Sequence, residues 1–144
     1  MSEKYLDDFS SWTTQTAQLL REHRWHEIDM PKLIEEVEDL GKSDRRGIAS
    51  QLIRLILHLL KWQYQPQRRS DIWLDSITDA RTQIELAIED SPSLRNYPAE
   101  QLKRVYTRAR RQAAKQTNMA ASMFPEVCPY SIDLILTDDW LPES

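Results

Sequence analysis

The chain has 144 residues, of which 40% are hydrophobic and 29% are charged, and 19 basic against 23 acidic residues give a formal net charge of -4. This composition is typical of a globular protein and excludes a disordered chain, and the length suits one domain. Two glycines argue against a turn-rich β sandwich and a glycine-rich phosphate loop, and the single Cys128 excludes an internal disulfide and a cysteine zinc site. The N-terminal residues MSEKYLDDF contain no apolar signal run, so we expect a cytoplasmic protein. The apolar run before Tyr64 is too short to span a membrane and is interrupted by Arg54, His58 and Lys61.

Apolar residues that recur every three to four positions predict helices along the first half of the chain. We expect a first amphipathic helix over 7–22 and a second helix from the N-cap Asp29 to a C-terminal stop at Gly41. A third helix is expected from the N-cap Ser43 to Tyr64. Because this third helix is apolar almost all round, we expect it to be the central, buried helix of a bundle.

The second half of the chain begins with two further amphipathic segments, which predict a fourth helix over 70–89 and a fifth over 98–117. Beyond the fifth helix the periodicity ends and prolines become frequent, but this tail is too apolar to be free. We therefore expect residues 118–144 to form a strap packed on the bundle, with a short sixth helix that Ser131 caps. The sequence predicts an all-α fold: a single-domain bundle of about five helices over residues 1–144.

The second predicted helix carries a block of acidic residues. Carboxylates at helical spacing can hold a divalent metal in a bundle core, and His58 of the third helix could add an imidazole. With Val37 at the centre of the predicted buried stripe, however, the carboxylates project opposite this stripe or onto its flanks. We interpret the block as a solvated face and assign no metal or cofactor, with a metal site, a catalytic site or a partner interface as the alternatives. The block comprises Glu35, Glu36, Glu38 and Asp39.

The fifth predicted helix carries a basic stripe on the side opposite its apolar residues. Like charges at such spacing destabilise a helix by about 0.2–0.5 kcal/mol per pair, and an anionic partner would relieve this repulsion. The partner could be nucleic acid phosphate, an acidic protein or the chain's own acidic helix. Because the chain is acidic overall and lacks a recognition motif, a solvated or self-paired face is favoured over nucleic acid binding. The candidate anion-binding stripe comprises Arg104, Arg108, Arg111 and Lys115.

An arginine lies close to the centre of the apolar stripe of the fourth predicted helix. A buried guanidinium is costly unless it is paired, so we expect Arg81 to be buried and to bond a carboxylate, either Glu36 or Glu38. Polar side chains also form a strip on the otherwise apolar third helix. We predict an interior polar network, with a binding or catalytic pocket as the alternative. The candidate set is Glu35, Glu36, Glu38, Asp39, Arg54, His58, Lys61 and Arg81.

Four segments carry a recognisable pattern: IEEVEDLGKSDRR (34–46), HLLKWQYQPQRRSDIW (58–73), DSPSL (90–94) and FPEVCPYSIDLIL (124–136). With these segments the chain resembles domain-of-unknown-function family 29, a bacterial family that is especially numerous in cyanobacteria. The resemblance extends from YLDDFSSW to DDWLP, nearly the whole chain, and implies an all-helical cytosolic protein. It implies no activity, because the family has no established function and no accepted catalytic residues.

Three classes of function follow from these observations. We favour a non-catalytic helical interaction module that binds a protein partner or a second copy of itself, because no Ser–His–acid spacing, nucleotide loop or metal-type histidine pair is present. The alternatives are a metal-assisted hydrolase with a carboxylate and histidine site, and a nucleic-acid binder that uses the fifth helix. The missing catalytic patterns argue against an enzyme. The sequence does not determine the activity, the ligand or the oligomeric state.

Overall fold

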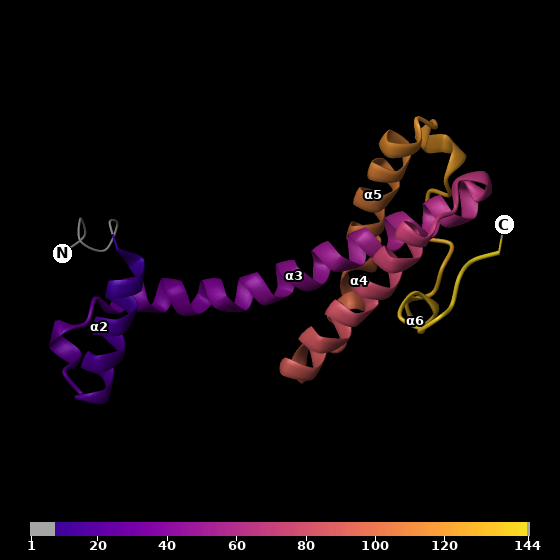
Figure 1. Ribbon diagram of the computed structural model, residues 1–144. Helices are drawn as coiled ribbons and strands as arrows, with labels where there is room; N and C mark the ends of the chain where they lie inside the picture. The colour runs from indigo at the N-terminus through magenta and orange to yellow at the C-terminus, as the bar shows by residue number, and fades with distance from the viewer. Residues whose placement is uncertain (1–7, 144) are drawn as a thin grey trace. The chain divides into compact units, whose positions relative to one another are not determined.

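The computed structural model describes residues 8–143, and the regular elements of this part of the chain are all helices (Figure 1). This confirms the predicted all-α fold. None of the helices described combines the length and the apolar character that crossing a bilayer would need. In chain order the α-helices are α2 (Phe9–Arg21), α3 (Met30–Tyr64), α4 (Asp71–Asp90), α5 (Tyr97–Thr117) and α6 (Ile132–Ile135).

The second and third predicted helices are one continuous helix, so the predicted stop at Gly41 is wrong. α3 runs without a break for 35 residues, and no glycine among the described residues has a positive φ. A glycine inside a helix costs only about 1 kcal/mol relative to alanine, and no proline follows that would end the helix. The predicted start is confirmed, because the Asp29 carboxylate accepts a hydrogen bond from the Lys32 N–H at 3.2 Å.

The chain divides into two compact units, residues 1–41 and 42–144, and each is described by itself. The described residues of the first unit form α2, a short 3-10 turn and the first turns of α3. α2 begins at the N-cap Asp8, whose carboxylate accepts a hydrogen bond from the Ser11 N–H at 2.9 Å. The expectation of one domain over 1–144 stays a prediction.

The apolar stripe at the start of α3 is largely exposed, and its predicted burial is wrong. Ile34, Val37 and Leu40 are 52%, 58% and 69% exposed. Among the described residues of the first unit, only Thr16 and Ile28 are buried. The physical reason is size, because two short helices can cover only one side of each other and do not enclose a core.

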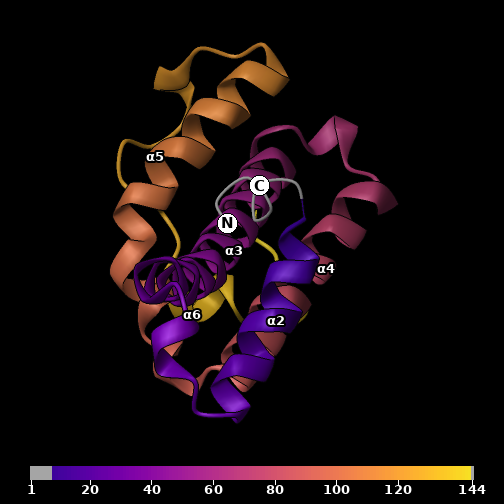
Figure 2. The same ribbon diagram turned by 90° about the vertical axis from the view of Figure 1, so that its left-hand side faces the viewer.

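In the second unit, the second half of α3 lies between α4 and α5, which Figure 2 shows on opposite sides of it. Ile56, Leu59 and Leu60 of α3 have no exposed surface. They pack in one cluster with Ile84 of α4 and Ala109 of α5. The prediction that the segment before Tyr64 is a central buried helix is therefore confirmed for this half of α3.

The residues that follow α5 pack on the second unit as a strap, as predicted. Asn118 ends α5 in the left-handed conformation, with φ 57°, and the chain reverses there. Phe124 and Ile135 of the strap are 2% and 0% exposed and belong to the core cluster. Ser131 caps α6, since its hydroxyl accepts a hydrogen bond from the Leu134 N–H at 3.2 Å.

Candidate anion-binding groove

The acidic block lies on α3 in the first unit, and three of its four carboxylates are exposed. The fourth, Glu36, is partly buried and forms an ion pair with Lys32 at 3.0 Å, while Glu35 lies 3.8 Å from the same ammonium group. These pairs link residues three and four positions apart along one helix, as is usual on a solvated helix surface. Within residues 8–143 no group of three or more His, Cys, Asp or Glu side chains is arranged to hold a metal ion.

The polar strip on the second half of α3 reaches the two helices beside it. Arg54 forms an ion pair with Asp79 of α4 at 2.6 Å, and this hydrogen bond lowers the pKa of the Asp79 carboxyl. Lys61 donates to the side-chain oxygen of Gln116 on α5 at 2.7 Å. Burial lowers the pKa of the Lys61 ammonium. These contacts join α3 to α4 and to α5.

His58 lies in the same strip, and its Nδ1 is 2.7 Å from the Arg54 carbonyl oxygen. Burial lowers the pKa of His58 below its ordinary value of 6.5, and the hydrogen bond to Arg54 offsets this effect only in part. In the unfolded chain the imidazole takes up a proton near its ordinary pKa, whereas in the folded chain it resists protonation until a lower pH.

We therefore expect stability to fall as the pH drops from about 6.5 through the lowered folded-state pKa, because the unfolded state binds more protons over this range. His58→Gln should lose this part of the pH dependence. The measurement is urea unfolding of both proteins between about pH 7 and 5. His26→Gln, which removes an exposed imidazole, is the control. Equal pH dependence of the unfolding free energy in His58→Gln and in the wild-type chain would show that His58 is not the source of this dependence.

Arg81 is 5% exposed, which confirms its predicted burial. Its predicted partner, a carboxylate of Glu36 or Glu38, is wrong. Arg81 Nε donates to the carbonyl oxygen of Ile135 at 2.8 Å, and Nη2 donates to that of Trp140 at 2.8 Å. Carbonyl oxygens at the end of α6 and in the strap thus take the place of a carboxylate, and burial lowers the pKa of the guanidinium.

Basic side chains gather in a groove of the second unit, between α3 and α5. The groove has a volume of about 450 Å³. Its floor and walls are partly apolar, with Ala49 and Ile53 from α3 and Tyr97 and Val105 from α5. No acidic side chain is among the described residues that line it. The basic residues that line it are Lys42, Arg45, Arg46, Arg104 and Arg108.

Helical spacing places the cations of each helix on one face, and the packing of α3 beside α5 brings the two sets into one groove. On α3, Lys42, Arg45 and Arg46 are three and four positions apart, and on α5, Arg104 and Arg108 are four apart. All five residues are exposed. In the part of the chain that the structure describes, none of them forms an ion pair. Within the described residues, no carboxylate therefore pairs with any of these five cations.

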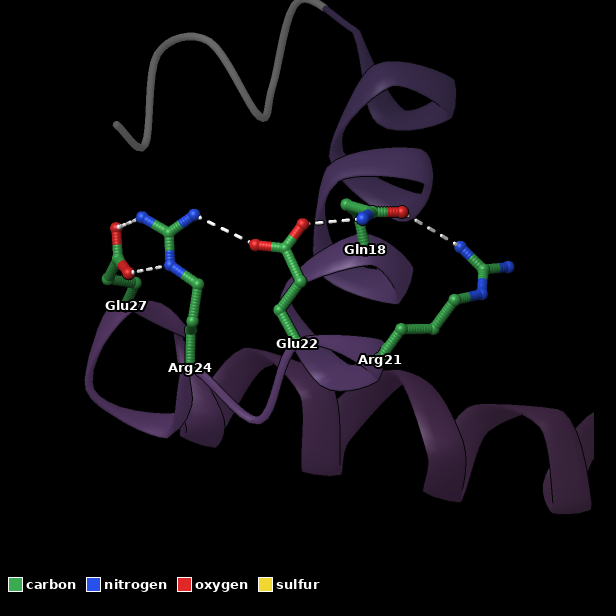
Figure 3. A network of polar contacts seen from close by, with 5 residues as sticks. All are labelled: Gln18, Arg21, Glu22, Arg24 and Glu27. Carbon is green, nitrogen blue, oxygen red and sulfur yellow. Dashed lines mark hydrogen bonds and ion pairs between the residues drawn. The ribbon is translucent and has the colours of Figure 1, made fainter.

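The network around Arg24 in the first unit shows the contrasting arrangement (Figure 3). Arg24 donates to Glu22 at 3.0 Å and to both carboxylate oxygens of Glu27. These hydrogen bonds raise the pKa of Arg24, and hydrogen bonds from Gln18 and Arg24 lower that of Glu22. Arg24, in the chain segment after α2, thus has carboxylate partners. The arginines that line the groove have no acidic residue among the described residues of its lining.

The groove only partly matches the predicted anion-binding stripe. Arg104 and Arg108 line it, whereas Arg111 and Lys115 are exposed residues further along α5. Sequence reasoning missed the three cations that α3 contributes. Their signal is the run KSDRR over 42–46, whose basic residues recur at helical spacing. The predicted helix start at Ser43 divided this run and hid the pattern.

Comparison with known proteins identifies a family for this chain. No curated protein and no solved structure matches this chain. One family model matches residues 4–141 of the 144, which is nearly the full length and agrees with the resemblance found in the sequence. The chain belongs to the family described as Domain of unknown function DUF29.

Proposed function

We propose that this chain is a non-catalytic binding module whose basic groove holds an acidic segment of a protein partner. The observation that carries the proposal is the groove of the second unit, lined by five basic side chains and, among the described residues, by no acidic one. Like charges held this close repel one another, so the groove gains free energy when carboxylates enter it.

The chemistry of the lining favours a segment that mixes carboxylates with aliphatic side chains. Four of the five cations are arginines, and the planar guanidinium bonds a carboxylate through two parallel hydrogen bonds. Between the charges, Ile53 and Tyr97 present apolar surface, next to the buried Ala49 and Val105. Aliphatic side chains of a partner would remove this surface from water, while its carboxylates pair with the rim.

The same features favour a protein segment over nucleic acid. The volume of about 450 Å³ lies in the range of ligand pockets, about 300–1,000 Å³, and suits a short stretch of chain. A nucleic acid needs a longer basic track, but Arg111 and Lys115 do not line the groove. The net charge of -4 also repels a long polyanion beyond the groove.

The test uses a fluorescent peptide of alternating glutamate and leucine, with binding followed by anisotropy. We expect Arg45→Gln combined with Arg108→Gln to weaken binding by about tenfold or more, because both cations face the peptide. The matched control, Arg111→Gln with Lys115→Gln, removes the same charge outside the groove and should change affinity by less than about twofold.

The same binding measurement with a generic DNA duplex tests the alternative of nucleic acid binding. We expect the duplex to bind more weakly than the peptide at about 150 mM salt. Tighter binding of the duplex, with a steep loss between about 50 and 200 mM salt, would favour nucleic acid instead. Equal losses of peptide binding in the groove variant and its control would show that the groove is not the site.

A further inference from the structure

The first unit presents a surface whose chemistry is complementary to the groove. In the segment 34–40 of α3, the aliphatic residues Ile34, Val37 and Leu40 are 52%, 58% and 69% exposed. Pairs of acidic residues separate these aliphatic residues in the sequence IEEVEDL, and all of them except Glu36 are exposed. Large exposed apolar patches rimmed by polar residues mark interaction sites.

Helix geometry places Glu38 on the flank of this aliphatic stripe. Ile34, Val37 and Glu38 lie at positions i, i+3 and i+4, which are neighbours on a helix surface. Neither Glu38 nor Asp39 forms an ion pair within the described residues. The segment thus offers the unpaired carboxylate of Glu38 beside an exposed aliphatic stripe, and the unpaired carboxylate of Asp39 on the opposite side of the helix.

We propose that the protein partner is a second copy of this chain, with residues 34–40 of one copy bound in the basic groove of another. This inference rests on the proposed function of the groove and names its partner. The charges are complementary, since the segment carries four acidic and no basic residues, and the groove is lined by five basic residues. Its aliphatic stripe would meet the apolar surface of the groove at Ile53 and Tyr97.

The small core of the first unit supports the same conclusion. A stretch of about 40 residues cannot usually enclose enough apolar surface to be stable by itself, and association is a common remedy. Only Thr16 and Ile28 are buried among its described residues. Seating the segment 34–40 in a groove of another copy would cover the aliphatic side chains that the unit leaves exposed.

Every copy carries both surfaces, so two modes of assembly follow. Reciprocal seating of two copies gives a closed pair, whereas one-way seating gives open chains. Both modes depend on the same contact between the segment 34–40 and the groove. The measured mass distinguishes the two modes.

The experiment is a charge reversal in the full chain, followed by sedimentation velocity over a range of concentrations. The first variant carries Glu38→Lys and Asp39→Lys, and the second carries Arg45→Glu and Arg108→Glu. We expect the wild-type chain to associate as its concentration rises, and each variant alone to associate about tenfold more weakly or not at all. An equimolar mixture of the two variants should regain association, because the reversed segment of one fits the reversed groove of the other.

A third variant, Arg111→Glu with Lys115→Glu, is the matched control. It has the same net charge as the groove variant but leaves the groove intact, so it should associate as the wild-type chain does. Circular dichroism checks that each variant is folded, and because all the substituted residues are exposed we expect unchanged helix content.

Two results would overturn the inference. One is a wild-type chain that remains monomeric at every concentration while its groove binds the Glu/Leu peptide, which would leave the proposed function standing with another partner. The other is association that persists in both charge-reversed variants, which would place the contact elsewhere. If the groove also fails to bind the peptide, the proposed function falls together with the inference.

Discussion

Replacing Arg81 with alanine is expected to lower the free energy of unfolding by about 3–4 kcal/mol. The side chain is 5% exposed, and two of its nitrogens donate to carbonyl oxygens of the strap at 2.8 Å. A hydrogen bond from a charged group contributes about 1.5–3 kcal/mol, and its removal leaves the carbonyls of Ile135 and Trp140 without this donor. A small domain has only about 5–15 kcal/mol of stability, so the loss should be conspicuous.

Urea denaturation followed by circular dichroism measures this loss, with Arg111→Ala as the control. Arg111 is an exposed arginine of α5, and its replacement should change the free energy of unfolding by no more than about 0.5 kcal/mol. Similar losses in the two variants would mean that the bonds between Arg81 and the strap contribute little to stability.

Replacing Phe124 with alanine should cost a similar amount, about 3–5 kcal/mol, for a different reason. The ring is 2% exposed and meets the Tyr64 ring edge to face, with 5.2 Å between the centroids. Its removal leaves a cavity in the core between the strap and α3. The backbone near Phe124 is also tied to α5, because Arg110 donates to the Phe124 carbonyl at 3.2 Å and Tyr106 donates to that of Pro125 at 2.5 Å.

The neighbouring Met123→Ala is the matched control for Phe124→Ala. Met123 is 58% exposed and lies one residue away on the same strap, so its replacement should cost less than about 1 kcal/mol. Thermal unfolding of the two variants makes the comparison, and equal midpoints would contradict the anchoring role of Phe124. Because Phe124 contacts α3 and α5 together, the strap joins the two helices whose side chains line the groove.

The sequence by itself determined most of the secondary structure and one unusual burial. Apolar residues at helical spacing located α4 and α5, and the apolar tail located the strap, since these signals depend on local periodicity. Projection also predicted the burial of Arg81, because the side chain lies close to apolar residues of α4 that prefer burial.

Only the tertiary structure decided what these side chains contact. It replaced the expected carboxylate partner of Arg81 with carbonyls more than 50 positions along the chain. It also left Val37 exposed, although the residue lies on an apolar stripe. A stripe shows which side of a helix prefers burial, but not whether another element covers that side.

For the groove, too, the sequence predicted one part and the tertiary structure decided the other. The sequence showed the cations of α5, including Arg104 and Arg108, as one helix face. It did not show that Lys42, Arg45 and Arg46 of α3 line the same groove, because spacing along one helix carries no information about the helix packed beside it. That neighbour is chosen by the fit of apolar side chains in the core, which only the assembled fold defines.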